Sequence, residues 1–453
     1  MYHNFKMKKL SSNFLFAVFF LLIVFTRSFA GIYIFEYRLG EYLVAFGLLI
    51  SFGIVFTNQK RFDFDKYTLN IFKLIILAFI TTILITGSDL TWTYTYRVTS
   101  FIWTASFVFI GYFLFKDNLS KNKALILMFG IVVIYVFGTG NYPDDLINIF
   151  KDIADKFTFV KASDMVLAII ITNLIILNFI RKEISYIYFL VSVTMFLPLI
   201  VQMSRGSAVA LIMFAIMYII FDFRYIFFSF KNIVIFVLLV PLVFVVSTYR
   251  VTQFDLSAIP TDELDQVLIE SFDEEIEKIR RLDREGNEVD PFLTLYFEER
   301  EHVTGKHMKL ISTDGTFNWR LDMWQELYYF QDDENKLLFG YGTTDKLPVF
   351  LLEYDSQNKF NIGHDQSNEQ IHNYFVNIFG RGGFLQLFLF LAFHVSLYLF
   401  YFKKYKNHYI LMLIFPSLFN SMTDISMEGV QFPINFYLTY GYLLTTGIRL
   451  KSI

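Results

Sequence analysis

Long runs of apolar residues, separated by short polar segments, occupy most of the chain. A helix needs about 20 mainly apolar residues to cross the roughly 30 Å hydrocarbon core of a bilayer. Runs that approach this length predict about twelve transmembrane helices, near residues 13–30, 40–57, 68–87, 98–115, 123–138, 163–180, 184–202, 207–221, 232–248, 384–402, 409–423 and 431–448. The pattern therefore predicts an all-α membrane protein, with a nine-helix transmembrane region over residues 1–248 and three C-terminal transmembrane helices over residues 384–453.

The segment between these two regions, residues 249–383, is polar and predicts a large helical loop. Residues 261–301 hold fifteen acidic and five basic side chains, so this stretch must be hydrated. Apolar residues at helical spacing predict an amphipathic surface helix within it, from Thr261 as a possible N-cap to Gly286 as a stop. Its charges are typical of a solvated face, and we assign no chemistry to them.

Two further helices are predicted in the loop. The first covers residues 318–330, and its apolar face consists of Phe317, Leu321, Trp324 and Tyr328. The second begins at Ser367, where Ser-Asn-Glu-Gln forms a capping box, and its apolar stripe consists of Ile371, Tyr374, Phe375 and Ile378. The glycines at positions 380, 382 and 383 then allow a break before the next transmembrane helix begins.

Lysine and arginine are enriched in every second connection between the predicted helices. With a cytoplasmic N-terminus, the inner termini and connections hold eighteen of these residues, whereas the short outer connections hold seven. Cytoplasmic loops of membrane proteins carry such an excess. The asymmetry predicts that both termini are cytoplasmic and that loop 249–383 lies on the outer face, provided that residues 207–221 cross the bilayer.

The composition restricts the class of function. The 453 residues are 55% hydrophobic and only 18% charged, whereas soluble domains carry roughly one-quarter charged residues. The net charge of −3, without a basic run interleaved with aromatic residues, excludes nucleic-acid binding. The absence of cysteine excludes disulfides and thiolate metal sites, and the seven histidines lack paired metal-ligand spacing. We therefore expect no metal and no cofactor.

Ser204-Arg205-Gly206 falls in a tight outer turn between two predicted transmembrane helices. Ser204 can cap the helix that is predicted to start at Ser207, and a helix start presents free N–H groups and a positive dipole end. Arg205 adds a guanidinium that can bind phosphate oxygens in a bidentate manner. These features suit a diphosphate at the membrane surface. The alternative is an arginine whose side chain only reaches the polar interface.

Arg320 and His372 are the other candidates for chemistry. Arg320 lies beside the apolar face of the first loop helix, where its guanidinium needs a carboxylate, an aromatic ring or an anionic ligand. A structural salt bridge to the acidic part of the loop is the alternative. His372 lies at the edge of the next apolar stripe, and a side chain that titrates near neutral pH suits a general base. The alternative is a packed, hydrogen-bonded histidine. Gly340-Tyr341-Gly342 predicts a turn, because no lysine follows it at the spacing of a phosphate-binding loop.

The order of these short motifs resembles the O-antigen ligase and polymerase superfamily. The resemblance rests on Ser204-Arg205-Gly206, on Arg320 with Trp324, and on His372-Asn373-Tyr374 followed by Gly380 and Gly383. It covers the whole layout, because that superfamily has about twelve transmembrane helices and a large outer loop before the last three. The resemblance implies a membrane glycosyltransferase of GT-C-like architecture that needs no metal. Such an enzyme takes a glycan from undecaprenyl diphosphate at the outer, periplasmic face of the bacterial inner membrane.

The resemblance also implies roles for individual residues. Arg205 and Arg320 would hold the diphosphate and stabilise its leaving charge, and His372 would orient or deprotonate the acceptor hydroxyl. Arg250 at the start of the loop and Arg381 near its end are further candidates for phosphate contact. The acidic residues 261–301 have no counterpart that we can place.

Several functions remain open at this stage. A polymerase, which we favour, adds the glycan to another lipid-linked repeat unit, whereas a ligase transfers it to lipid A core or to protein. A polysaccharide transporter or flippase would need polar or broken helices in mid-membrane, and apart from Lys73 the ionisable residues lie near the ends of the predicted helices. A structural or sensory membrane protein is the third class. The expected partners are membrane lipid, the lipid-linked donor, a glycan or lipid A core acceptor and a chain-length regulator protein.

Overall fold

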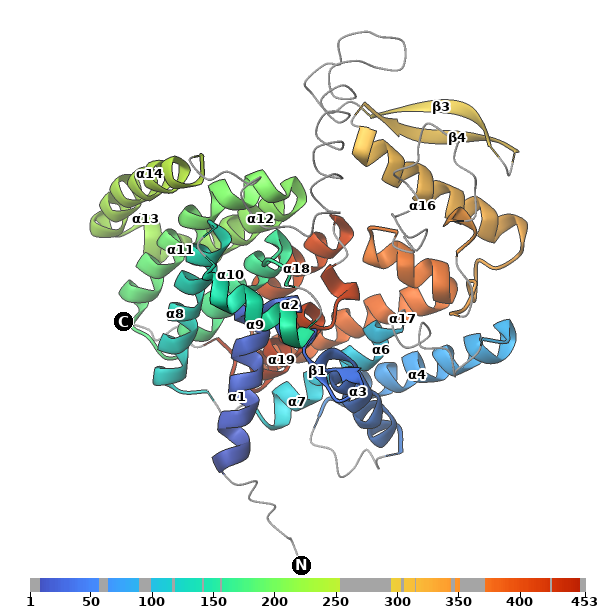
Figure 1. Cartoon of the computed structure of the whole chain (residues 1–453), viewed down its shortest axis with the longest axis horizontal. Coiled ribbons are helices and arrows are strands. Elements are labelled where there is room, and N and C mark those ends of the chain that lie inside the picture. Colours follow the sequence, from blue (N-terminus) through green and yellow to red (C-terminus); the bar gives the residue numbers. More distant parts are fainter. Residues whose placement is uncertain are drawn as a thin grey trace, which may run out of the picture. The chain divides into compact units, whose positions relative to one another are not determined.

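A computed structural model describes most of the chain (Figure 1). The described residues are 9–56, 64–88, 99–115, 119–140, 142–154, 157–252, 295–302, 305–313, 315–343, 347–350, 371–423 and 426–448. The amphipathic helix predicted from Thr261 to Gly286 lies outside these residues, as does the predicted capping box at Ser367. The chain divides into two compact units. We call Met1–Leu77, Tyr96–Phe254 and Leu389–Ile453 the bundle unit, and Ala78–Thr95 with Asp255–Phe388 the loop unit.

Helices fill most of the bundle unit. They are α1 (Lys9–Val24), α2 (Thr26–Ala30), α3 (Leu39–Phe56), α6 (Ser100–Ala105), α7 (Phe107–Phe113), α8 (Lys121–Gly138), α9 (Asp144–Ala154), α10 (Ala162–Ile176), α11 (Lys182–Met203), α12 (Arg205–Phe221), α13 (Phe223–Phe227), α14 (Phe230–Thr252), α18 (Leu411–Thr423) and α19 (Gln431–Thr446). Two more helices, α4 (Lys66–Thr86) and α17 (Tyr374–Tyr405), belong partly to each unit. A short hairpin of β1 (Tyr33–Ile34) and β2 (Tyr37–Arg38) precedes α3.

Each of the twelve predicted transmembrane segments contains helix. Six helices among the described residues are long and apolar enough to cross a membrane: α3, α4, α8, α11, α14 and α17. Five shorter apolar helical segments, of 10–17 residues, accompany them. The mostly helical membrane fold is therefore confirmed. The number of spans, their orientation, and the boundaries at residues 248 and 383 remain predictions.

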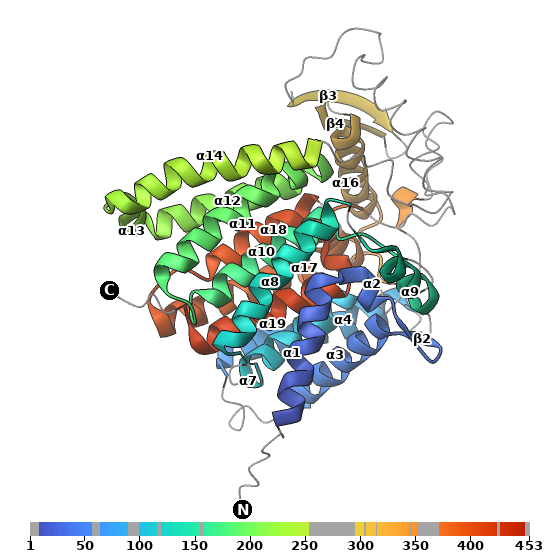
Figure 2. The ribbon, with the colours of Figure 1, turned by 60° about the vertical axis from the view of Figure 1, so that its left-hand side comes forward.

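Helix α10 forms the centre of the bundle unit. Its sequence is apolar on nearly every face, and all fifteen of its residues are buried against α1, α8, α11, α12, α18 and α19. A helix that is hydrophobic all round is stable only inside such a core or in a membrane. Helix α14 is the opposite case, because only 11% of its apolar window is buried inside the protein, and it packs on α11 (Figure 2). Its remaining apolar surface suits contact with lipid.

The loop unit contains a β-hairpin that the all-α prediction missed. Strands β3 (Leu295–His302) and β4 (Gly305–Ser312) pair antiparallel, with Leu295 opposite Ser312, and β4 packs on helix α16 (Gly315–Asp333) (Figures 1 and 2). Polar side chains of α16 form hydrogen bonds with backbone groups of β4. Gln325 accepts from the Leu310 N–H at 2.7 Å and donates to the Leu310 carbonyl at 3.0 Å, and the Tyr329 hydroxyl donates to the Met308 carbonyl at 3.0 Å.

Helix α16 confirms the predicted loop helix at 318–330 and extends beyond it at both ends. Its predicted apolar face is only partly correct. Leu321 is buried, but Tyr328 is exposed, and Leu327 lies instead in a small core with Leu347, Val349 and Ile371. The hairpin and this core lie on different sides of α16, so the helix buries two stripes where the sequence pattern indicated one.

Helix α17 does not begin where the capping box predicted. Ile371, His372 and Asn373 are not helical, and the helix begins at Tyr374. The Asn373 side chain is the N-cap, because its Oδ1 accepts from the backbone N–H groups of Phe375 at 3.0 Å and Val376 at 3.2 Å. The capping box itself lies outside the described residues, and the non-helical backbone at 371–373 shows only that α17 does not extend back to it.

The predicted glycine break is confirmed at Gly383, where φ is 64° and ψ is −168° inside α17. Such a break frees carbonyl groups that need new donors. Gln331 of α16 donates to the carbonyls of Phe379 and Gly380 at 3.1 and 3.0 Å, and the Tyr341 N–H donates to Gly380 at 2.9 Å. On the far side of the break, the Phe384 N–H donates to the Leu337 carbonyl at 2.8 Å. Residues 337–342 thus complete the hydrogen bonding of the broken helix.

Replacing Gly383 by alanine is expected to lower the free energy of unfolding by about 2–3 kcal/mol. Alanine would have to adopt the positive φ of this residue, and its Cβ would overlap the backbone of Leu338. Gly53→Ala in α3 is the control, since a Cβ at Gly53 meets nothing within 4 Å and alanine favours a helix. Thermal unfolding in detergent measures both. An unchanged melting temperature for Gly383→Ala would show that the break needs no glycine.

Candidate functional site

Arg205 is the first residue of α12, and Ser204 is the N-cap, as the sequence predicted, although the helix starts two residues earlier than expected. Ser204 has extended backbone angles, and its hydroxyl oxygen accepts from the Ser207 N–H at 3.3 Å. The Arg205 side chain is exposed. A guanidinium at a helix N-terminus lies beside backbone N–H groups and the positive end of the helix dipole. The local geometry therefore suits an anion.

His372 lies in a short segment whose two neighbours are both fixed. Its φ of 54° is left-handed, which is uncommon for a residue with a side chain. Before it, the carbonyl of the fully buried Ile371 accepts from the Trp324 indole N–H at 2.8 Å. After it, Asn373 caps α17. The imidazole itself is partly exposed, so the backbone is restrained while the ring remains accessible.

An aromatic ring lies next to the imidazole. The ring centroids of Trp319 and His372 are 5.2 Å apart, with 60° between their planes. Trp319 precedes Arg320 on α16, and both side chains are partly buried. The loop unit therefore brings the start of α16 against the segment that carries His372. The sequence indicated Trp324 as part of a packed face but gave no sign that Trp319 contacts the histidine.

Arg381 and Arg250 differ in their surroundings. The Arg381 side chain is 2% exposed, and its Nη1 donates to the Gly342 carbonyl at 3.3 Å, while the Gly342 N–H donates back to the Arg381 carbonyl at 2.9 Å. Gly340 and Gly342 have φ values of 68° and 75°, which confirms the predicted turn. The described contact of Arg381 thus holds that turn. Arg250 is exposed in the last turn of α14.

Tyr341, between the two glycines, lies under a cation. The Lys336 ammonium is 4.3 Å from the centroid of the Tyr341 ring. Burial, and after it the charge of Glu334, raise the pKa of the Tyr341 hydroxyl above its usual value. The phenol therefore stays protonated at neutral pH and serves packing rather than proton transfer.

The five candidate residues fall into two sets. Arg205 and Arg250 belong to the bundle unit, and Arg320, His372 and Arg381 belong to the loop unit. Within the loop unit, the structure places His372 beside Trp319 of α16 and Arg381 on the glycine turn. Within the described ranges, no group of three or more histidine, aspartate or glutamate side chains could hold a metal ion.

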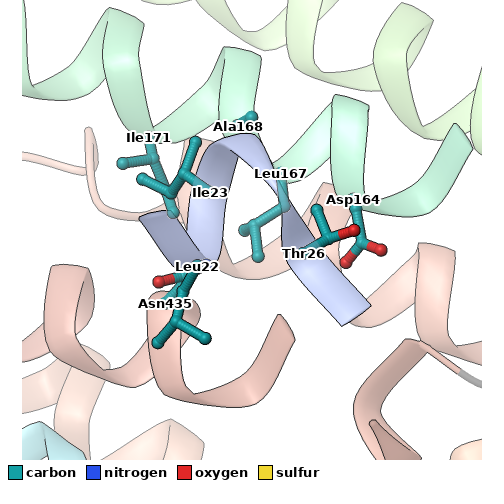
Figure 3. A pocket seen from close by; sticks show the side chains of 8 residues that line it. All are labelled: Leu22, Ile23, Thr26, Asp164, Leu167, Ala168, Ile171 and Asn435. Carbon is teal, nitrogen blue, oxygen red and sulfur yellow. The ribbon is translucent and has the colours of Figure 1, made fainter. Parts of the chain in front are cut away.

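The bundle unit also contains a small pocket, and none of the candidate residues lines it. It is lined by Leu22, Ile23, Thr26, Asp164, Leu167, Ala168, Ile171 and Asn435. Figure 3 shows the Thr26 hydroxyl beside the Asp164 carboxylate at one end. Gln431 of α19 donates to both carboxylate oxygens, at 3.5 and 3.4 Å. No role for Asp164 is predicted from the sequence, because a single acidic residue at the start of an apolar run resembles an ordinary helix start.

Comparison with known proteins supplies the family. Residues 190–391 match a family model described as O-antigen ligase, and this region includes Arg205, Arg250, Arg320, His372 and Arg381. No curated protein matches the chain. The match confirms the resemblance drawn from the short motifs. Over residues 190–391, the chain is therefore similar to the O-antigen ligase family.

Proposed function

We propose that this protein is a membrane glycosyltransferase that takes a glycan from undecaprenyl diphosphate and transfers it to an acceptor sugar hydroxyl. The product is a polymer of O-antigen, capsule or exopolysaccharide repeat units. The observation that carries the proposal is the O-antigen ligase match, because it spans all five candidate residues. The exposed arginine at the start of α12 and the restrained histidine before α17 supply the two kinds of group that the reaction needs.

The proposed reaction is a displacement at the anomeric carbon. The acceptor oxygen forms a bond to that carbon, while the bond from the carbon to the diphosphate oxygen breaks and its electrons leave with undecaprenyl diphosphate. The proton of the acceptor hydroxyl passes to His372, which acts as general base. Arg205 and Arg320 neutralise the charge that develops on the leaving diphosphate. Arg250 and Arg381 are proposed as further phosphate contacts, and Arg381 also binds the Gly342 carbonyl of the glycine turn.

The site is proposed to face the outer side of the inner membrane, with both termini in the cytoplasm. This orientation follows the distribution of lysine and arginine along the chain. It exposes the loop to the lipid-linked repeat units, to the acceptor and to a chain-length regulator. Labelling of single cysteines introduced at Gly31 and at Arg224, in a chain that has no cysteine of its own, tests the orientation directly.

Arg205→Ala is expected to lower the transfer rate roughly 100-fold, as the loss of one preorganised charge-stabilising donor does in other enzymes. The matched control is Arg224→Ala, which removes another exposed arginine, from α13. The assay uses the purified protein in nanodiscs and the lipid-linked glycan extracted from membranes of the source cells. Equal rates for Arg205→Ala and the wild type would contradict the proposed role of Arg205.

The length of the product separates the polymerase from the ligase. A polymerase lengthens the lipid-linked glycan when donor alone is supplied, giving a ladder of products. A ligase produces no ladder and transfers the glycan only when lipid A core or an acceptor protein is added. Transport of the lipid across the bilayer without any transfer would favour the flippase instead.

A further inference from the structure

The N-terminal turn of α12 is attached to two other helices through one buried amide. Asn420 of α18 is fully buried, as is Ser207 in the first turn of α12. The Ser207 hydroxyl donates to Asn420 Oδ1 at 2.9 Å, and Asn420 Nδ2 donates to the Ser163 carbonyl of α10 at 3.3 Å. A buried amide is costly unless both its ends are bonded, so this side chain fixes α12, α10 and α18 together.

Two hydrogen-bonded serines, Ser204 and Ser207, flank Arg205 in the sequence. Ser207 uses its backbone N–H for the Ser204 cap and its hydroxyl for Asn420, so both hydrogen-bond donors at this position are engaged. Between them, Gly206 lies so close to α18 that a Cβ would overlap the Thr423 side chain. The backbone that follows Arg205 is therefore held against α18, and Ser204 before it is bonded to the same turn, while the guanidinium remains exposed. Preorganised binding of an anion requires that the backbone carrying the charged side chain is held rigidly in place.

We infer that Asn420 is a positioning residue for Arg205, and that α18 sets where the diphosphate is bound. This inference rests on the proposed function of Arg205. Asn420 lies outside residues 190–391, so the family match does not reach it. It touches no substrate and acts only through Ser207 and the first turn of α12.

Asn420→Ala is expected to weaken binding of undecaprenyl diphosphate and to lower kcat/KM about tenfold, an effect typical of residues that orient a functional group. The probe for binding is undecaprenyl diphosphate without a glycan, titrated into the full-length protein in nanodiscs. The matched control is Asn173→Ala. Asn173 is also a buried amide inside the bundle unit, and it bonds the Ile169 carbonyl and the Ser192 hydroxyl at 2.9 and 3.0 Å.

A double-mutant cycle separates positioning from general stability. In an Arg205→Ala background, Asn420→Ala is expected to cause no further loss of binding, whereas a purely structural effect would add to the first. Ser207→Ala is expected to reproduce Asn420→Ala, because it removes the same hydrogen bond. An active Asn420→Ala beside an inactive Arg205→Ala would contradict only the positioning role. Full activity of Arg205→Ala would contradict both the positioning role and the proposed function.

Discussion

His372→Ala is expected to slow glycan transfer about 1000-fold, within the range that a positioned general base contributes. The acceptor hydroxyl is a weak nucleophile, and its proton must be removed as the new bond forms. The structure gives the imidazole a restrained backbone, with the Ile371 carbonyl bound by Trp324 on one side and the Asn373 cap on the other. Because these restraints involve the neighbours and not the ring, the alanine variant should retain the fold of the segment.

His372→Asn makes the test sharper. Asparagine tolerates the left-handed conformation at φ 54° better than alanine does, but it cannot accept the proton. Both variants should therefore lose transfer while retaining the affinity for undecaprenyl diphosphate.

The control for both variants is His307→Ala. The ring of His307 stacks on Tyr329, with centroids 3.8 Å apart, on the hairpin of the same unit. Single-turnover rates measure the chemical step for all three variants. Rates within threefold of the wild type for His372→Asn would exclude His372 as the base.

The helices were predictable because a bilayer imposes a simple rule on the sequence. Inside lipid, the backbone N–H and C=O groups must form hydrogen bonds with one another, so each membrane helix needs an apolar run of sufficient length. Each predicted run contains helix in the structure. The α16 helix was predictable for a related reason, since its tryptophan and leucine recur at helical spacing. These signals are local, and they need no knowledge of which residues meet across the fold.

The hairpin was not predictable in the same way. In β3, which is rich in charge, residues 295–299 are exposed, and β4 buries Lys309 together with Ile311 while it exposes Met308. A strand that buries a lysine and exposes a methionine reverses the pattern on which sequence interpretation relies. Its partner α16 determines which side is buried, and that partner becomes evident only in three dimensions.

The same contrast between local signals and distant contacts applies to the candidate site. Arg205, Arg320 and His372 were chosen because their side chains carry the right chemistry and lie near helix ends. The contacts around Arg205 and His372 come from Asn420, Trp319 and Asn373, which look like ordinary core or surface residues in the sequence. Asn373 caps α17 and the Ile371 carbonyl is bound by Trp324, two contacts that the pattern of apolar residues did not indicate.

Lys309→Met is expected to destabilise the loop unit by about 3–5 kcal/mol, the usual cost of leaving one charge of a buried ion pair without its partner. Lys309 of β4 forms an ion pair with Glu326 of α16, and both side chains are fully buried. Asp322 lies farther away, with its Oδ1 3.8 Å from the Lys309 ammonium. Without the lysine, the Glu326 carboxylate would lose its countercharge in a site that excludes water. The β4 strand would then separate more easily from α16.

Replacing both partners by apolar residues of similar volume should restore stability. The attraction between two buried charges does little more than offset the free energy needed to remove them from water. The double variant Lys309→Met with Glu326→Leu is therefore expected to unfold within about 1 kcal/mol of the wild type or to exceed it. Denaturant unfolding followed by tryptophan fluorescence is a suitable measurement, because Trp319 and Trp324 lie on α16.

Lys336→Met supplies the matched control, since it breaks a half-exposed pair with Glu334 in the same unit and should change stability by less than about 1 kcal/mol. If Lys309→Met proves as stable as this control, the buried pair does not hold the hairpin to α16. If the double variant is as unstable as the single one, the charge itself and not its desolvation is what the hairpin requires.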